Sequence, residues 1–359
     1  SYIYAHSAHN LAHHGALAFN RGEPVHAATS PLWAAFGAIG PMVGVESIDW
    51  LRNGGLLLGA LAVLVLSRML VRELGSRPEF AWVAVLVVAT EPWLVRWSSS
   101  AMETPLAALL VAIALDATLR PTDRVAWRRA ALAIGLLPLV RPEALLLVAI
   151  FGVHVLRSPS VRTRWDLYVL AAGPFAAWTA LAIPLYGHPL PETMRAKSTP
   201  LGFRPERLLY NVRVMAQILA VGAAVPVLVW AWSLVRRPAR LVRPERDCWG
   251  ATAWWQWTLV LPVVYLVRDV QVVSRYLELV LPAMIVLATL AIAWRFTRVA
   301  IFAFGLQAML AFGLTVAWIA PSARAFGTSL DAGLGDISEY LRTETPPDAT
   351  VAIYEIGLI

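Results

Sequence analysis

Long apolar stretches alternate with short polar connections along most of the chain. A membrane-spanning helix needs about 20 apolar residues, and shorter spans occur inside helical bundles. The pattern predicts ten membrane-spanning helices, near residues 52–70, 79–95, 104–119, 128–140, 143–156, 166–185, 208–235, 252–267, 277–294 and 299–319. The fourth and fifth are short, and Pro142 separates them because proline has no N–H and disfavours helical geometry in its predecessor. We therefore expect an all-α polytopic membrane protein.

The composition favours the same class. Hydrophobic residues make up 58% of the chain and charged residues only 15%, whereas about a quarter of a soluble domain is charged. These proportions exclude a soluble enzyme and an intrinsically disordered chain. The single cysteine, Cys248, excludes an internal disulfide framework and a thiolate metal cage. Only one of the 30 basic residues is a lysine, which indicates a GC-rich bacterial genome rather than a nucleic-acid surface.

Arginine is distributed unevenly between the connections. Alternate connections, with the helix ends beside them, contain 17 of the 30 basic residues and only six acidic ones. Excess arginine marks cytoplasmic loops, and it also suits contacts with lipid headgroups. Since Ser1 then lies outside, we expect at least one span before it and a chain that is a fragment. The outward-facing segments are 1–51, 96–103, 141–143, 186–207, 268–276 and 320–359.

The first outward segment is rich in histidine. Residues 2–14 can form an amphipathic interfacial helix that Gly15 ends. Neutral imidazoles one turn apart can bind a metal ion, but polar side chains at the membrane interface are the simpler interpretation. The histidines that share one face of this helix, or lie beside it, are His6, His9, His13 and His14.

Glu103 comes just before the third predicted span, at its outer end. Pro105 suits the first turn of that helix, where a carboxylate can act as a cap that the helix N-terminus stabilises. The functional alternative is a carboxylate facing an outer cavity, as a general base or metal ligand. Glu91 is either a hydrogen-bonded helix-end residue or a second acid in the same cavity. Arg141 and Glu143 either pair with each other or line a vestibule.

Two other outward segments combine cations with polar side chains. The loop at 186–198 has two prolines, a histidine, a glutamate and the cations Arg195 and Lys197. Arg275 and Tyr276 begin the ninth span. The helix dipole disfavours a cation at a helix N-terminus, so Arg275 is not explained as a cap. Guanidinium groups match phosphate through paired hydrogen bonds, and the three cations therefore suggest an anionic ligand.

Several short motifs follow one another along these segments. They are Asn10-Leu11-Ala12, His14-Gly15, Phe19-Asn20-Arg21-Gly22-Glu23, Thr29-Ser30-Pro31-Leu32-Trp33, Met102-Glu103-Thr104, Val140-Arg141-Pro142-Glu143, Tyr186-Gly187, Leu190-Pro191, Ala196-Lys197, Arg275-Tyr276 and Leu281-Pro282. In this order they resemble the GT-C glycosyltransferases that use a polyprenyl-phosphate sugar. The resemblance is closest to bacterial terminal β-arabinofuranosyltransferases and more distant to protein O-mannosyltransferases and aminoarabinose transferases. Departures are Ala101 for glycine, Glu192 for asparagine and Arg21 for proline.

The resemblance implies both a domain organisation and a site. Residues 1–33 would be a first extracytoplasmic loop, 34–319 a transmembrane domain, and 320–359 the beginning of an extracytoplasmic α/β domain, with a strand after residues 345–349. The main catalytic acid would lie before Ser1, so the fragment alone is expected to be inactive, with Glu103 as a supporting acid. The implied phosphate ligands are Arg275, Lys197, Arg195 and Arg141. The implied pocket residues are Tyr276, Glu143, Thr29, Trp33 and His14.

We therefore expect a glycosyltransferase of the bacterial plasma membrane that is active on the outer face. The implied donor is a polyprenyl-phosphate sugar and the acceptor a glycan, lipid or protein of the cell envelope, with a divalent cation left open as cofactor. A transporter or flippase is one alternative, although such proteins favour midplane charges and repeated, broken helices. A catalytically inactive scaffold is another. An acidic pair before Ser1 would support the enzyme.

Overall fold

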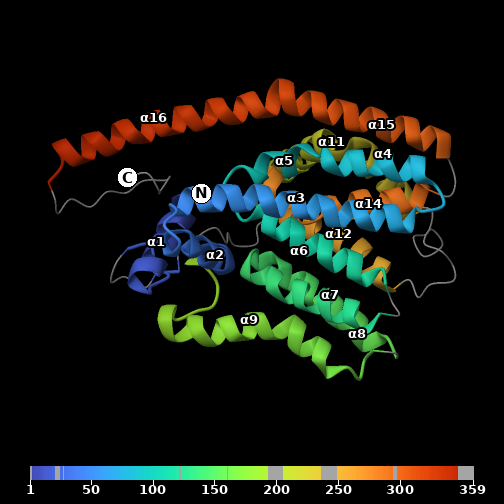
Figure 1. Cartoon of the computed structure of the whole chain (residues 1–359), viewed down its shortest axis with the longest axis horizontal. Helices are drawn as coiled ribbons and strands as arrows, with labels where there is room; N and C mark the ends of the chain where they lie inside the picture. The colour runs from blue at the N-terminus through green and yellow to red at the C-terminus, as the bar shows by residue number, and fades with distance from the viewer. Residues whose placement is uncertain are drawn as a thin grey trace.

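Helices account for the regular structure of the chain (Figure 1). The computed structural model describes residues 2–20, 25–26, 28–120, 123–159, 161–192, 205–235, 249–293 and 297–346, and no strand occurs among them. The α-helices are α1 Tyr2–His14, α2 Pro31–Met42, α3 Ser47–Glu73, α4 Pro78–Ala89, α5 Pro92–Ser98, α6 Thr104–Thr118, α7 Arg124–Leu136, α8 Leu145–Arg157, α9 Trp165–Tyr186, α11 Pro205–Val235, α12 Trp249–Val267, α13 Ser274–Leu277, α14 Leu281–Ile292, α15 Thr297–Leu314 and α16 Ala320–Glu344. Short turns of other helix types are η1 Leu137–Leu139, η2 Pro142–Ala144 and η4 Thr315–Ile319.

Among the described residues, four helical segments are long and apolar enough to cross a membrane. They are α3, α9, Glu206–Trp232 of α11 and Arg298–Ser329, which runs from α15 into α16. Helices α4 and α5 make a fifth if they form one span bent by 46°. Each of the ten predicted intervals falls on helix, which confirms an all-α membrane protein. The count of ten spans stays a prediction, since several of these helices are shorter than a bilayer requires.

Glycines allow some helices to approach each other very closely. A Cβ atom added to Gly59 of α3 would lie 2.1 Å from Oγ of Ser98 in α5, and one added to Gly135 of α7 would lie 2.3 Å from the carbonyl oxygen of Leu170 in α9. Small residues at such crossings replace side-chain contact by close backbone packing, as is common between membrane helices. The contact between α7 and α9 therefore depends on the absence of a side chain at position 135.

We expect Gly135→Val to lower the thermal stability of the detergent-solubilised protein. The added side chain meets the α9 backbone, which cannot move aside as a flexible side chain would, and such overpacking costs about 1–3 kcal/mol. Gly152→Val in α8 is the matched control, because no atom lies within 4 Å of a Cβ added there. Equal shifts in melting temperature for the two variants would contradict this account of the α7–α9 contact.

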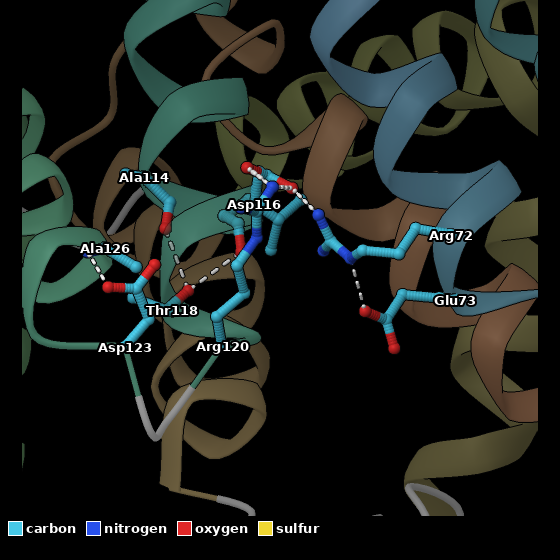
Figure 2. A network of polar contacts seen from close by, with 9 residues as sticks. Arg72, Glu73, Ala114, Asp116, Thr118, Arg120, Asp123 and Ala126 are labelled. Carbon is cyan, nitrogen blue, oxygen red and sulfur yellow. Dashed lines mark hydrogen bonds and ion pairs between the residues drawn. The ribbon is translucent and has the colours of Figure 1, made fainter.

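A polar network joins helices at the arginine-rich end of the bundle (Figure 2). Arg72 of α3 donates from Nη1 to Oδ1 of Asp116 in α6 at 2.6 Å, and Arg120 donates from Nη2 to Oδ2 of the same carboxylate at 2.7 Å. Asp123 begins α7 by accepting a 2.8 Å hydrogen bond from the amide of Val125. Partly exposed ion pairs of this kind contribute little free energy each. Two of the arginines expected to mark the cytoplasmic side thus also bind a carboxylate within the protein.

The C-terminal part of the described chain is one extended helical arm. A π-helical turn, η4, joins α15 to α16, and α16 extends past the rest of the bundle (Figure 1). Residues 320–344, expected to begin an α/β domain, belong to α16. The strand expected after residues 345–349 lies outside the described residues. The α/β domain therefore stays a prediction.

Candidate functional site

Three segments that are distant in sequence meet around the guanidinium group of Arg141. This residue lies between η1 and η2, and its side chain is 8% exposed. Its Nε atom is 3.2 Å from Oε1 of Glu103 and its Nη1 atom is 3.6 Å from Oε1 of Glu143. Its Nη2 atom donates to the backbone carbonyl oxygen of Arg275 at 3.2 Å. Of the two alternatives that the sequence left open for Arg141 and Glu143, the structure has the pairing.

Aromatic side chains line the same cluster. The guanidinium carbon of Arg141 is 4.9 Å from the ring centre of Tyr276, and that of Arg275 is 5.5 Å from the same ring and 5.9 Å from the ring of Trp97. Tyr265 of α12 donates its hydroxyl to Oε1 of Glu143 at 3.0 Å. Aromatic faces stabilise cations electrostatically without neutralising them, so Arg275 keeps its charge available.

Glu103 is an ion-pair partner and does not cap α6. Its position corresponds to the helix N-cap, but its side chain makes no capping hydrogen bond, which corrects the capping interpretation. Burial alone would raise the pKa of Glu103, but the positive charges of Arg141 and Arg275 outweigh burial and hold that pKa below its usual value. Glu103 is therefore an ionised carboxylate in a buried position.

The turn before α6 is supported by the Thr29-Ser30-Pro31-Leu32-Trp33 motif. Ala101 adopts a left-handed backbone with φ of 56°, and its carbonyl oxygen accepts a 3.1 Å hydrogen bond from the indole N–H of Trp33. Trp33 is completely buried. Its backbone amide donates a 3.2 Å hydrogen bond to the hydroxyl of Ser30, which caps the start of α2. The hydroxyl of Thr29 is hydrogen-bonded to that of Tyr4. This segment positions Glu103 through the backbone.

The other predicted site residues lie elsewhere or beyond description. His14 is exposed at the end of α1, with its ring 6.3 Å from that of His13. Arg195 and Lys197 lie outside the described residues. The preceding loop is ordered by His188, whose Nε2 atom is 2.5 Å from Oε1 of Glu192.

Four aromatic or imidazole side chains of this region escaped the sequence analysis. Tyr4, Trp97 and Tyr265 surround the charged cluster, and His26 stacks on Tyr186 with ring centres 5.2 Å apart. Tyr265 lies within a predicted span, where the apolar pattern carries no information about a hydroxyl partner. The sequence signal for Trp97 and His26 was their place in predicted outward segments beside the motifs.

Burial lowers the pKa of His26 to about 4, so the folded protein favours its neutral form. The groups beside it are His188, which opposes protonation, and Glu192, which favours it. Because the folded-state pKa is below the unfolded value, this contribution to stability is present at neutral pH and is lost as pH falls from about 6.5 to about 4. We expect His26→Gln to remove about 2 kcal/mol of acid-induced destabilisation. Thermal unfolding across that pH range tests this, with the exposed His14→Gln variant as control. An equal loss of melting temperature at acid pH in wild type and His26→Gln would contradict it.

Metal ligands do not gather in the described part of the chain. No group of three or more His, Cys, Asp or Glu side chains suited to a metal ion occurs among the described residues. Glu103, the acid nearest the arginines, is already paired with Arg141.

Comparison with known proteins finds a shared fold without a close relative. No family model and no curated protein matches the chain. Solved structures of the oligosaccharyltransferase of Archaeoglobus fulgidus share its fold. The complex with Zn and sulfate gives a TM-score of 0.53 at 15% identity, covering 88% of this chain and 48% of that one. The apo form gives 0.56 at 14% identity, covering 97% and 54%.

The chain thus spans about half the length of the solved structures that it resembles. At these identities the likeness establishes the fold alone. A fold shared with an oligosaccharyltransferase agrees with the GT-C resemblance of the sequence motifs, and the more specific resemblance to arabinofuranosyltransferases stays a prediction.

Proposed function

We propose that the chain belongs to a membrane glycosyltransferase of the GT-C type that uses a polyprenyl-phosphate sugar as donor. Its acceptor would be a glycan, lipid or protein of the cell envelope, on the outer face of a bacterial plasma membrane. Three independent features support this proposal. They are the ordered motifs of the sequence, the fold shared with an oligosaccharyltransferase, and the buried cluster of charged side chains around Arg141.

The side chain of Arg275 is the single observation that carries the proposal. Within the described residues no carboxylate pairs with it, and Nη1 contacts only the sulfur of Met102, at 3.8 Å. Its Nε atom is buried without a hydrogen-bond partner in that part of the chain. A buried donor without a partner is costly. An anionic oxygen of the donor phosphate would supply the missing acceptor.

Arg141 and Glu103 have supporting roles in this proposal. Arg141 is held by two carboxylates and by the backbone of Arg275, so it positions the segment that bears the phosphate ligand. A carboxylate paired with a guanidinium is a weak base. Glu103 is therefore suited to orient the acceptor, and the main base would be the acid expected before Ser1. Lys197 and Arg195 stay as further candidates for the phosphate.

The reaction proposed is a displacement at the anomeric carbon of the donor sugar. The acceptor oxygen forms a bond to that carbon, and its proton passes to the catalytic carboxylate. The bond between the anomeric carbon and the phosphate oxygen breaks, and the polyprenyl phosphate leaves with the electron pair. Donors aimed at the oxygen on which charge develops lower the barrier most. Arg275 would serve this purpose.

Transfer assays with the complete natural protein in nanodiscs test the proposal. A panel of polyprenyl-phosphate sugars would be offered with an acceptor extract from the cell envelope, and transfer of labelled sugar would be measured. Transfer from at least one donor, lost in the Arg275 variant, is the expected result. Movement of lipid-linked or free sugar across the bilayer without transfer would replace the proposal with a transporter, and binding without either activity would favour a scaffold.

A further inference from the structure

Three helix breaks meet at a pair of buried glutamates away from the arginine cluster. Helices α4 and α5 are interrupted at Glu91, and α13 and α14 are separated by a turn that contains Glu278. Helix α11 is kinked at Ala223, whose φ of −158° and ψ of 53° are not helical. Glu91 is 3% exposed and Glu278 is 1% exposed. Breaks in membrane helices are tolerated where other groups satisfy the freed backbone.

Side chains do satisfy the backbone freed by these breaks. The indole N–H of Trp93 donates to the carbonyl oxygen of Ile218 at 2.9 Å, and the amide of Val225 donates to Oε1 of Gln307 at 3.2 Å. The arrangement is therefore built and specific. What remains without a hydrogen-bond partner in the described part of the chain is Oε1 of Glu91 and both carboxyl oxygens of Glu278.

The two carboxyl groups face each other without a compensating cation. Each carboxyl group is the charged group that interacts with the other, and no arginine, lysine or histidine of the described residues stabilises the charge of either. Arg96 and Arg275, the nearest cations in sequence, lie over the ring of Trp97 instead. From α11, Gly222 presents no side chain, and a Cβ added there would lie 2.7 Å from Oε1 of Glu91. From α15 the polar group is the neutral Gln307 amide.

Two ionised carboxylates in such a place would be very costly. An isolated buried charge is strongly destabilising, and two neighbouring carboxylates ordinarily retain one proton between them. Glu91 is the better site for the charge, since its Oε2 atom accepts a 2.5 Å hydrogen bond from the amide of Leu94 at the start of α5. That leaves Glu278, with two unsatisfied oxygens, to carry the proton.

We propose that Glu91 and Glu278 form a proton-binding site, in which the protonated carboxyl group of Glu278 donates to Oε1 of the Glu91 carboxylate. One proton then gives a partner to two of the three unpartnered oxygens and halves the buried charge. The pair connects α5 to the turn after α13. Trp97 lies six residues after Glu91, and Arg275 lies three residues before Glu278. Loss of the proton would make the two carboxylates repel each other and so separate the segments that carry Trp97 and Arg275. That last consequence rests on the proposed function, whereas the binding of the proton does not.

Thermal unfolding as a function of pH tests the site without any activity assay. The folded protein holds one proton more than the unfolded chain above the unfolded glutamate pKa of about 4.3. Above about pH 6.5, where the opposing titration of His26 is complete, its folding equilibrium should therefore weaken about tenfold per pH unit until the folded pair loses the proton. Glu278→Gln donates the same hydrogen bond permanently and should remove this alkaline decline. Exposed Glu206→Gln in α11 is the control and should keep it.

Two outcomes of these unfolding experiments would overturn the proposal. One is an alkaline decline of equal slope in wild type and Glu278→Gln. The other is a cation effect at alkaline pH: the wild-type melting temperature rises when sodium, magnesium or calcium chloride replaces choline chloride, and this rise is absent in Glu278→Gln. That result would assign the site to a metal cation. Infrared spectroscopy of the wild type needs no variant to fold. A carbonyl band of a protonated carboxyl group should be present at neutral pH, and its absence would refute the shared proton.

Discussion

Replacing Arg275 by alanine should lower sugar transfer by the complete protein about a hundredfold or more. A donor aimed at developing charge contributes about 3 kcal/mol to lowering a barrier, which corresponds to this factor in rate. The effect should fall mainly on kcat, because negative charge on the leaving phosphate is greatest in the transition state. Arg275→Lys should recover part of the activity, since it restores the charge but lacks the planar fork that matches phosphate.

Two comparisons make this prediction specific. Arg52→Ala removes another arginine from the predicted outward side, which is exposed and pairs with Asp49 at 3.5 Å, and should leave transfer unchanged. Melting temperatures of all variants would show whether activity is lost through unfolding. Transfer by a folded Arg275→Ala protein at the wild-type rate would eliminate the phosphate role of this residue.

Replacing Arg141 by methionine should cause a large loss of stability. The substitution keeps much of the side-chain volume but leaves Glu103 without its closest counter-charge and Glu143 with the Tyr265 hydroxyl alone. Removing one member of a buried ion pair typically costs about 3–5 kcal/mol, because the remaining charge is uncompensated. Thermal unfolding in detergent or nanodiscs measures this change.

A second substitution separates charge from packing at this position. Glu103→Gln added to Arg141→Met should recover part of the lost stability, since it removes the uncompensated carboxylate. Arg128→Met is the matched control, because Arg128 is 62% exposed and pairs with Asp166 at the surface; its cost should stay below about 1 kcal/mol. If Arg141→Met costs no more than this control, the buried pairing contributes little to stability.

The apolar pattern located the helices of the ten predicted intervals but not α2 or α16. Each predicted interval contains helix, Gly15 ends α1 with a φ of 68°, and the break at Pro142 separates the η1 and η2 turns. These features depend on interactions between residues close in sequence, which composition and spacing reveal. The same pattern did not identify the break at Ala223, because alanine itself favours helix; the local signal is Pro226, which has no N–H to donate to the carbonyl oxygen of residue 222.

For the charged side chains, the sequence and the tertiary structure answer different questions. The sequence by itself predicted that Glu103, Arg141, Glu143 and Arg275 lie on outward segments, because helix boundaries and arginine-rich loops follow local composition. Only the tertiary structure decided that Arg141 takes both carboxylates, that Arg275 is left with aromatic neighbours, and that Glu91 faces Glu278. Arg141 and Glu103 are 38 residues apart, and Glu91 and Glu278 are 187 residues apart. Hydrophobic periodicity specifies which face of a helix is buried but not which distant helix it meets.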